Sequence, residues 1–124
     1  MCLNIDNVKS YLKNKPLSIS VSRNNNTTVY KVNGKIFAIL SEDIYPHIIL
    51  KNEPLLNKAL RKKFNFIFPA SNILNKTYWN TIILIDGLDD EVLFKMIDKS
   101  YELSVETMTK RQKAHYHYEI SDLA

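Results

Sequence analysis

The chain has 124 residues, of which 45% are hydrophobic and 24% charged, as in a folded domain with a single core. No apolar run reaches the about 20 residues that a membrane-spanning helix needs. The N-terminus lacks the basic and apolar regions of a signal peptide, and the single cysteine permits no internal disulfide. We therefore expect a folded cytoplasmic protein without a membrane segment.

The formal net charge of +4 is compatible with a polyanionic partner, although a moderate positive charge also serves solubility. Fourteen of the 17 basic residues are lysine. Lysine makes less specific contacts with phosphates and base edges than arginine does. Any contact with nucleic acid should therefore favour the backbone over the base sequence.

The first third of the chain predicts one helix followed by two strands. Apolar residues recur at helical spacing across Ile5–Lys13, and Pro16 lies just beyond the expected end of this helix. Leu17–Val21 alternates as a strand does, and a polar turn separates it from a second strand at Thr27–Val32.

Asn33-Gly34 is the strongest local signal, because a two-residue type I′ hairpin needs positive φ at both central positions. Counting outward from this turn pairs Tyr30 with Phe37. The predicted register places a set of alternating residues on one face of the hairpin: Thr28, Tyr30, Val32, Phe37 and Ile39. Both faces are apolar enough to predict a central position in the sheet.

Another strand is expected at Tyr45–Lys51, where Pro46 indicates an edge position or a bulge. Asn52 can cap a helix that continues to about Phe64. The apolar residues of this helix predict that one face packs inward: Leu55, Leu56, Ala59, Leu60 and Phe64.

The segment Phe66–Asn75 is expected to be irregular and Asn80–Asp86 to be a strand, followed by a long helix from Asp89 to about Glu106. These elements predict an α+β fold with a mostly antiparallel sheet of about five or six strands, flanked by N-terminal, middle and long C-terminal helices. Residues 1–113 form the predicted domain. The tail 114–124 forms a further helix, docks on a partner or stays mobile.

Several short motifs occur together along the chain: Asn33-Gly34-Lys35 with Phe37-Ala38, Leu50-Lys51, Leu60-Arg61, Leu74-Asn75-Lys76, Tyr78-Trp79-Asn80-Thr81 and Ser100-Tyr101-Glu102-Leu103. In this combination, over roughly residues 5–113, the chain resembles the MmcQ/YjbR family of small bacterial proteins. The resemblance implies an α+β fold related to that of frataxin (CyaY) and a proposed DNA-binding role. Arg23–Asn26 and the tail beyond Lys113 depart from the family pattern.

A group of basic residues in and around the middle helix is the best candidate for contacts with DNA phosphates: Lys51, Lys58, Arg61, Lys62, Lys63 and Lys76. The alternative is a solvated helix face whose cations favour the helix C-terminus. A second basic group, Lys110, Arg111 and Lys113, is weaker evidence of the same kind.

Asn75, Tyr78 and Trp79 form an alternative candidate site, a pocket for a small ligand or a protein partner. Trp79 suits either stacking on an unpaired base or burial against the sheet. Asn75 suits either ligand binding or a turn in which its side chain bonds the backbone.

No nucleophile motif or glycine-rich phosphate loop is present, so we do not expect an enzyme or a cofactor. His115 and His117 would project together from a strand, but other ligands for a closed metal site are missing nearby, and we expect no metal. The sequence favours weak, sequence-independent DNA binding, with a pocket-centred interaction module as the alternative.

Overall fold

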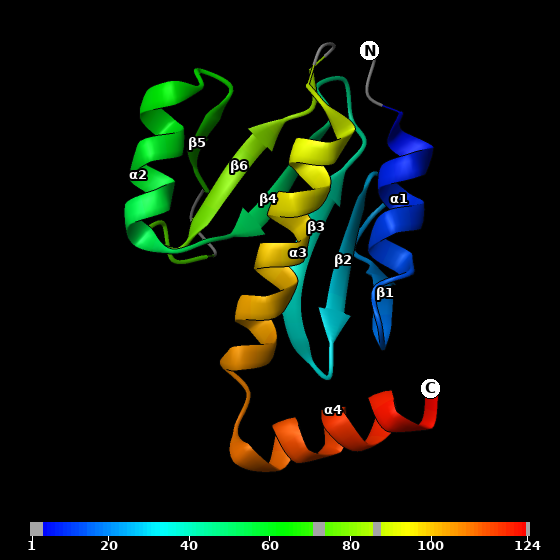
Figure 1. The fold of residues 1–124 in the computed structure, drawn as a ribbon. Helices are drawn as coiled ribbons and strands as arrows, with labels where there is room; N and C mark the ends of the chain where they lie inside the picture. The colour runs from blue at the N-terminus through cyan, green and yellow to red at the C-terminus, as the bar shows by residue number, and fades with distance from the viewer. Residues whose placement is uncertain (1–3, 71–73, 86–87, 124) are drawn as a thin grey trace.

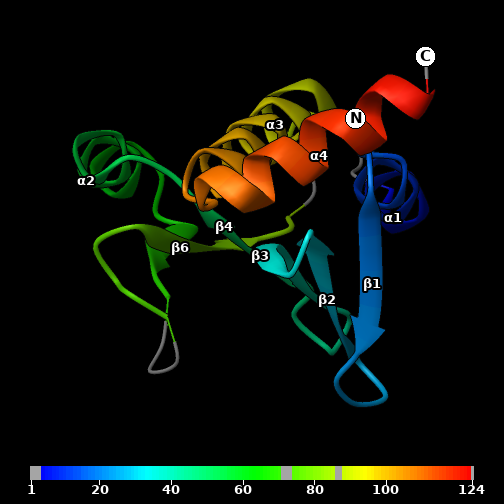
Figure 2. The same cartoon turned by 90° about the horizontal axis from the view of Figure 1, so that it is seen from below.

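A computed structural model describes residues 4–70, 74–85 and 88–123. It is an α+β fold, as predicted, in which one antiparallel sheet of six strands carries the helices on the same side (Figures 1 and 2). The elements in chain order are α1 (Ile5–Lys13), β1 (Ser18–Ser22), β2 (Thr27–Val32), β3 (Lys35–Ser41), β4 (His47–Lys51), α2 (Pro54–Lys63), β5 (Ile67–Pro69), β6 (Trp79–Ile83), α3 (Asp90–Glu106) and α4 (Lys110–Leu123). The strand order across the sheet is β1-β2-β3-β4-β6-β5.

The hairpin between β2 and β3 confirms the predicted turn but not the predicted register. Asn33 has φ 48° and Gly34 has φ 81°, both positive. Tyr30 pairs with Ala38 rather than Phe37, because a β-bulge inserts Phe37 as an extra residue on β3. Phe37 and Ala38 are consequently both buried in the main apolar cluster, although strict alternation along a strand would place these adjacent residues on opposite faces.

Helix α3 packs across β3 and β4 and satisfies backbone groups near the bulge. The Ser100 hydroxyl donates to the Phe37 carbonyl at 2.6 Å and accepts from the Lys51 N–H at 2.8 Å. Ser104 Oγ donates to the Ile36 carbonyl at 3.0 Å. Since buried backbone groups are costly without partners, these two buried serines fix the position of α3 on the sheet.

Two expectations for the second half of the sheet were wrong. The edge position considered for β4 was wrong, because β4 pairs with both β3 and β6 and is therefore central. A central position is possible because Pro46 precedes the first paired residue, His47, and so removes no hydrogen bond from the paired strand. Within the segment expected to be irregular, β5 adds a short edge strand beside β6. The paired part of β6 ends at Ile83, and Asp86 lies outside the described residues.

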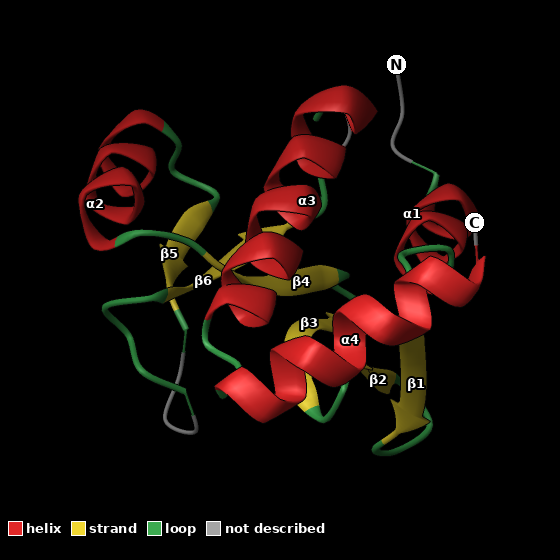
Figure 3. Cartoon of the chain, turned by 60° about the horizontal axis from the view of Figure 1, so that its bottom comes forward, coloured by secondary structure: helices red, strands yellow, loops and turns green. Residues whose placement is uncertain are grey.

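The C-terminal segment folds as α4, which runs from the end of α3 toward α1 (Figure 3). The Tyr101 hydroxyl donates to the Pro16 carbonyl at 2.5 Å and lies 2.9 Å from the Tyr116 hydroxyl. Burial, followed by the interaction with Tyr116, raises the pKa of Tyr101 well above its usual value. Position 113 lies inside α4, so this helix continues directly from the predicted domain into the tail.

None of the helices in the described part of the chain is both long enough and apolar enough to cross a bilayer.

We expect Gly34→Val to lower the free energy of unfolding by about 1–3 kcal/mol, because a β-branched residue is strained at positive φ. An added Cβ would meet no atom within 4 Å, so the loss would come from the backbone conformation alone. Urea unfolding measures the difference. Gly34→Asn is the control and should lose less, since asparagine tolerates the left-handed region; equal stability of the valine variant and the parent would contradict the turn assignment.

Candidate functional site

The basic charge of the protein is concentrated in one continuous segment. Pro54–Ile85 contains five basic residues and no acidic residue, whereas the rest of the chain carries 12 basic and 13 acidic residues. The segment folds into α2, β5 and β6, which lie together at one end of the sheet (Figure 1). Positive charge is therefore concentrated at this end of the molecule, and Glu53, the residue before α2, is the acidic side chain that borders it in sequence.

Of the predicted cationic residues, four are exposed at this end. Lys58, Lys62 and Lys63 lie on α2, and Lys76 lies in the turn before β6. Lys51, at the end of β4, is partly buried. Burial, together with the nearby charge of Lys35, lowers the pKa of the Lys51 ammonium group.

Arg61, which was grouped with the lysines because of its charge, makes hydrogen bonds within the protein. Its Nε donates to Asn80 Oδ1 at 2.7 Å, and its Nη2 donates to the Lys76 carbonyl and, at 3.5 Å, to the Trp79 carbonyl. These bonds tie α2 to β6 and to the turn before it. Arg61 therefore has a structural role, and it holds the backbone of Lys76 beside α2.

The predicted apolar face of the middle helix is only partly turned inward: Leu60 and Phe64 pack against the main apolar cluster, but the fully buried residue of α2 is polar. Leu55 and Leu56 are 80% and 46% exposed, whereas Asn57 is fully buried. Asn57 Nδ2 donates to the carbonyls of Asn52 and Thr77, at 3.1 and 3.0 Å, and Asn57 Oδ1 accepts from Asn80 Nδ2 at 2.8 Å. Helical spacing was therefore correct for Leu60 and Phe64 but wrong for the first turn of α2, where the buried hydrogen bonds of Asn57 take the inward position.

Asn75 and Trp79, two of the three residues of the predicted pocket, have structural roles. Asn75 Oδ1 accepts from the Thr77 N–H at 2.9 Å, and the Asn75 carbonyl accepts from the N–H groups of Tyr78 and Trp79. Trp79 is only 8% exposed, and strand alternation places it with Thr81, on the side of β6 opposite Asn80. Asn75 thus forms a turn, one of the two roles considered for it, and the indole ring has little free surface for stacking.

Tyr78 is the member of the predicted pocket that remains accessible, with 41% of its surface exposed. Lys51 Nζ lies 5.8 Å from the centre of the Tyr78 ring and 6.0 Å from that of Trp79. Lys51 and Tyr78 line a cavity of about 450 Å³ that also contacts the C-terminal end of α3. This cavity adjoins the basic end of the molecule.

The second basic group lies elsewhere. Lys110, Arg111 and Lys113 belong to α4, which contacts the β2–β3 turn through a 3.1 Å hydrogen bond from Asn33 Nδ2 to the Gln112 carbonyl. The turn is in the other half of the sheet from α2 (Figure 1). The two basic groups therefore do not form one surface.

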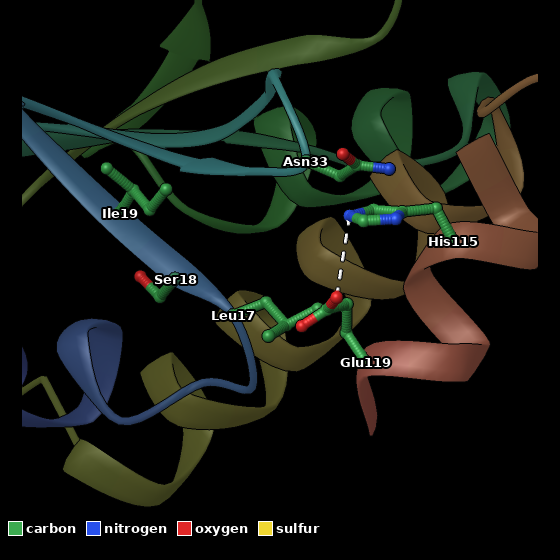
Figure 4. Close-up of a pocket in the computed structure, with 6 residues that line it drawn as sticks. All are labelled: Leu17, Ser18, Ile19, Asn33, His115 and Glu119. Carbon is green, nitrogen blue, oxygen red and sulfur yellow. Dashed lines mark ion pairs between the residues drawn. The ribbon is translucent and has the colours of Figure 1, made fainter. Parts of the chain in front are cut away.

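The histidines that suggested a metal site are on a helix rather than a strand. His115 lies near Glu119, with Nε2 and Oε1 3.9 Å apart, in a cavity of about 310 Å³ between α4 and β1 (Figure 4). A spacing of two residues does not place His115 and His117 on the same helix face. The described residues include no group of three or more side chains suited to metal binding.

A family model named YjbR matches residues 17–103. The chain belongs to the YjbR family. The uncharacterized protein YjbR of Escherichia coli K12 is 28% identical to it over 113 residues, which cover 90% of this chain and 95% of that protein. The match to YjbR from E. coli O157:H7 has the same values.

Solved structures share the fold of this YjbR-family chain. The crystal structure of the Deinococcus radiodurans protein DR2400, a DUF419 domain, superimposes with a TM-score of 0.81 at 24% identity, covering 92% of this chain and 88% of that one. A crystal structure of a Pseudomonas syringae protein gives a TM-score of 0.70 at 24% identity, covering 82% of this chain and 99% of that one. At this level of identity, the likeness concerns the fold alone.

We expect Asn57→Ala to lower the free energy of unfolding by about 1–3 kcal/mol or more, because it removes partners from Asn80 and two backbone carbonyls. Denaturant unfolding measures this loss. Lys58→Ala, at the adjacent exposed position on the same helix, is the control and should change stability by less than about 0.5 kcal/mol. An Asn57 variant as stable as this control would show that the buried hydrogen bonds do not hold α2.

Proposed function

We propose that this YjbR-family protein binds DNA weakly and without sequence preference, through the exposed lysines Lys58, Lys62, Lys63 and Lys76. The observation that carries the proposal is the acid-free basic end formed by α2, β5 and β6. We further propose that the protein acts in the cytoplasm and is not an enzyme.

The exposed lysines are available for an anionic partner. The four ion pairs between described residues do not include Lys58, Lys62, Lys63 or Lys76. With 10 residues, α2 is about 15 Å long, which is enough to pass several phosphates of a duplex. No acidic side chain interrupts the segment, and the charge of Glu53, which precedes α2, is offset by its ion pair with Lys99, so a polyanion would meet little local repulsion along α2.

The structural role of Arg61 supports binding through phosphates rather than bases. Arginine is the side chain best suited to bidentate recognition of a base edge, and Arg61 is the only arginine of the basic end. Its Nε and Nη2 groups already donate to Asn80 and to backbone carbonyls. The remaining cations are lysines, which act as point charges without base preference.

The alternative function, a pocket-centred interaction module, rests on Tyr78 together with Lys51. Of the three residues first assigned to that pocket, Tyr78 lines the cavity of about 450 Å³, and Asn75 and Trp79 are not among its described lining residues. The cavity is within the size range of small-molecule sites. A ligand in this cavity would bind without contacting the exposed lysines of α2.

Binding to duplex DNA should weaken steeply with salt. If four phosphates are neutralised, the logarithm of the affinity should fall with the logarithm of the salt concentration at a slope of about −3.6. Fluorescence anisotropy at several salt concentrations measures the slope. Replacing Lys58 and Lys62 together by alanine should flatten it by about 1.8 units, because two phosphate contacts are lost.

The control is the double alanine variant of Lys13 and Arg23, two exposed basic residues on α1 and in the turn after β1, which changes the net charge equally. It should leave the slope almost unchanged. An unchanged slope in the Lys58/Lys62 variant, equal effects of both double variants, or no binding at low salt would each reject α2 as the DNA-binding surface.

A further inference from the structure

The cavity beside Tyr78 has features that duplex binding does not use. The Tyr78 ring is 41% exposed and follows Lys76, an exposed cation of the basic end, by two residues. Lys51 Nζ lies over the same ring, 5.8 Å from its centre. An exposed aromatic ring with a cation close to it is an arrangement by which proteins bind single-stranded nucleic acid, with bases stacked on rings and phosphates beside the charges.

Another part of the cavity lining offers acceptors for hydrogen bonds. It is formed by Leu103, Glu106 and Thr107 at the end of α3. Glu53, which also lines the cavity, forms an ion pair with Lys99 at 3.2 Å, whereas the ion pairs between described residues do not involve Glu106. An ionised carboxylate only accepts, so Glu106 would favour a base that carries an exocyclic amino group.

We propose that this cavity binds an unpaired base, stacked on Tyr78 and contacted at its edge by Glu106, with Lys51 beside the phosphate. The preferred ligand of the basic end is then single-stranded rather than duplex DNA. The inference rests on the proposed DNA-binding function: the phosphate contacts of the lysines have no sequence preference, and the cavity adds a preference for one unpaired base. In a duplex, the faces of the bases are stacked and their pairing edges are occupied, so the cavity could engage only single strands.

The structure also indicates why Tyr78, and not Trp79, provides the stacking surface. Trp79 is 8% exposed, which leaves too little of the indole ring for a base. Tyr78 takes part in the fold through its backbone: its N–H donates to the Asn75 carbonyl at 3.1 Å and its carbonyl accepts from the Asn52 N–H at 2.8 Å. Substitutions of the Tyr78 ring should therefore preserve the fold.

The test compares Tyr78→Ala and Tyr78→Phe with the parent on three ligands: a single-stranded deoxycytidine oligomer of about 12 nucleotides, an abasic oligomer of the same length, and duplex DNA. The abasic oligomer keeps the phosphates but has no bases. Tyr78→Ala should weaken binding of the deoxycytidine oligomer by about 5- to 150-fold, the range that one stacked base provides. Tyr78→Phe keeps the ring and should bind within about twofold of the parent.

Neither variant should change the affinity for the abasic oligomer or the duplex, and thermal melting should show both variants folded. The parent should also prefer the deoxycytidine oligomer to a thymidine oligomer, since thymine lacks the amino group, and Glu106→Ala should remove that preference. Equal binding of the two oligomers by the parent would overturn the contact with Glu106.

The outcomes separate this inference from the proposed function. If the parent binds the duplex and the abasic oligomer as tightly as the deoxycytidine oligomer, and Tyr78→Ala changes nothing, then the base site is rejected while phosphate binding stands. If none of the three ligands binds at low salt, then the proposed DNA-binding function fails, and this inference fails with it.

Discussion

The hydrogen-bond network of Asn57, Asn80 and Arg61 is the constraint on which the basic end of this protein depends. Asn57 and Asn80 are buried, and a buried polar group without partners costs free energy. Here both amide side chains donate and accept, and the guanidinium of Arg61 closes the network onto the backbone of β6. Since neutral hydrogen bonds are strengthened when a charged donor joins them, the network orients α2 firmly at the edge of the sheet.

That orientation has an electrostatic consequence. With Asn57 turned inward, Lys58 and Lys62 of the same helix face solvent, and the contact of Arg61 with the Lys76 carbonyl brings the turn before β6 beside them. The positive end of the molecule is thus positioned by the buried hydrogen bonds of Asn57 together with the apolar contacts of Leu60 and Phe64. The Tyr78 cavity adjoins it because the same turn leads into β6.

The sequence revealed the local features of the fold well. Asn33-Gly34 adopts positive φ at both positions, and α3 begins next to Asp89, whose side chain accepts from the Glu91 N–H at 3.0 Å. Such turns and caps depend on residues that are adjacent in the chain. The bulge at Phe37 could not be predicted in this way, because it depends on backbone contacts with Ser100 and Ser104, more than 60 residues later.

The candidate site was predicted only in part, because some of its residues have partners that are distant in the sequence. Charge alone identified Lys58 and Lys62, which are exposed, but it grouped them with Arg61, whose partners come from a strand 18 or 19 residues farther along the chain. The helical spacing of apolar residues predicted that Leu55 faces inward, because such a prediction assumes that the buried face of a helix is apolar. The Asn57 side chain has three partners from three segments, and such a residue gives no periodic signal.

The central claim is that Arg61 belongs to the fold and not to the ligand surface. A double-mutant cycle on Arg61→Ala and Asn80→Ala, followed by denaturant unfolding, measures the coupling between the two side chains directly. We predict a coupling energy of about 1.5–3 kcal/mol, the range for a hydrogen bond to a charged group. Additive losses, together with an Arg61→Ala variant that is fully stable but binds DNA more weakly, would contradict this account.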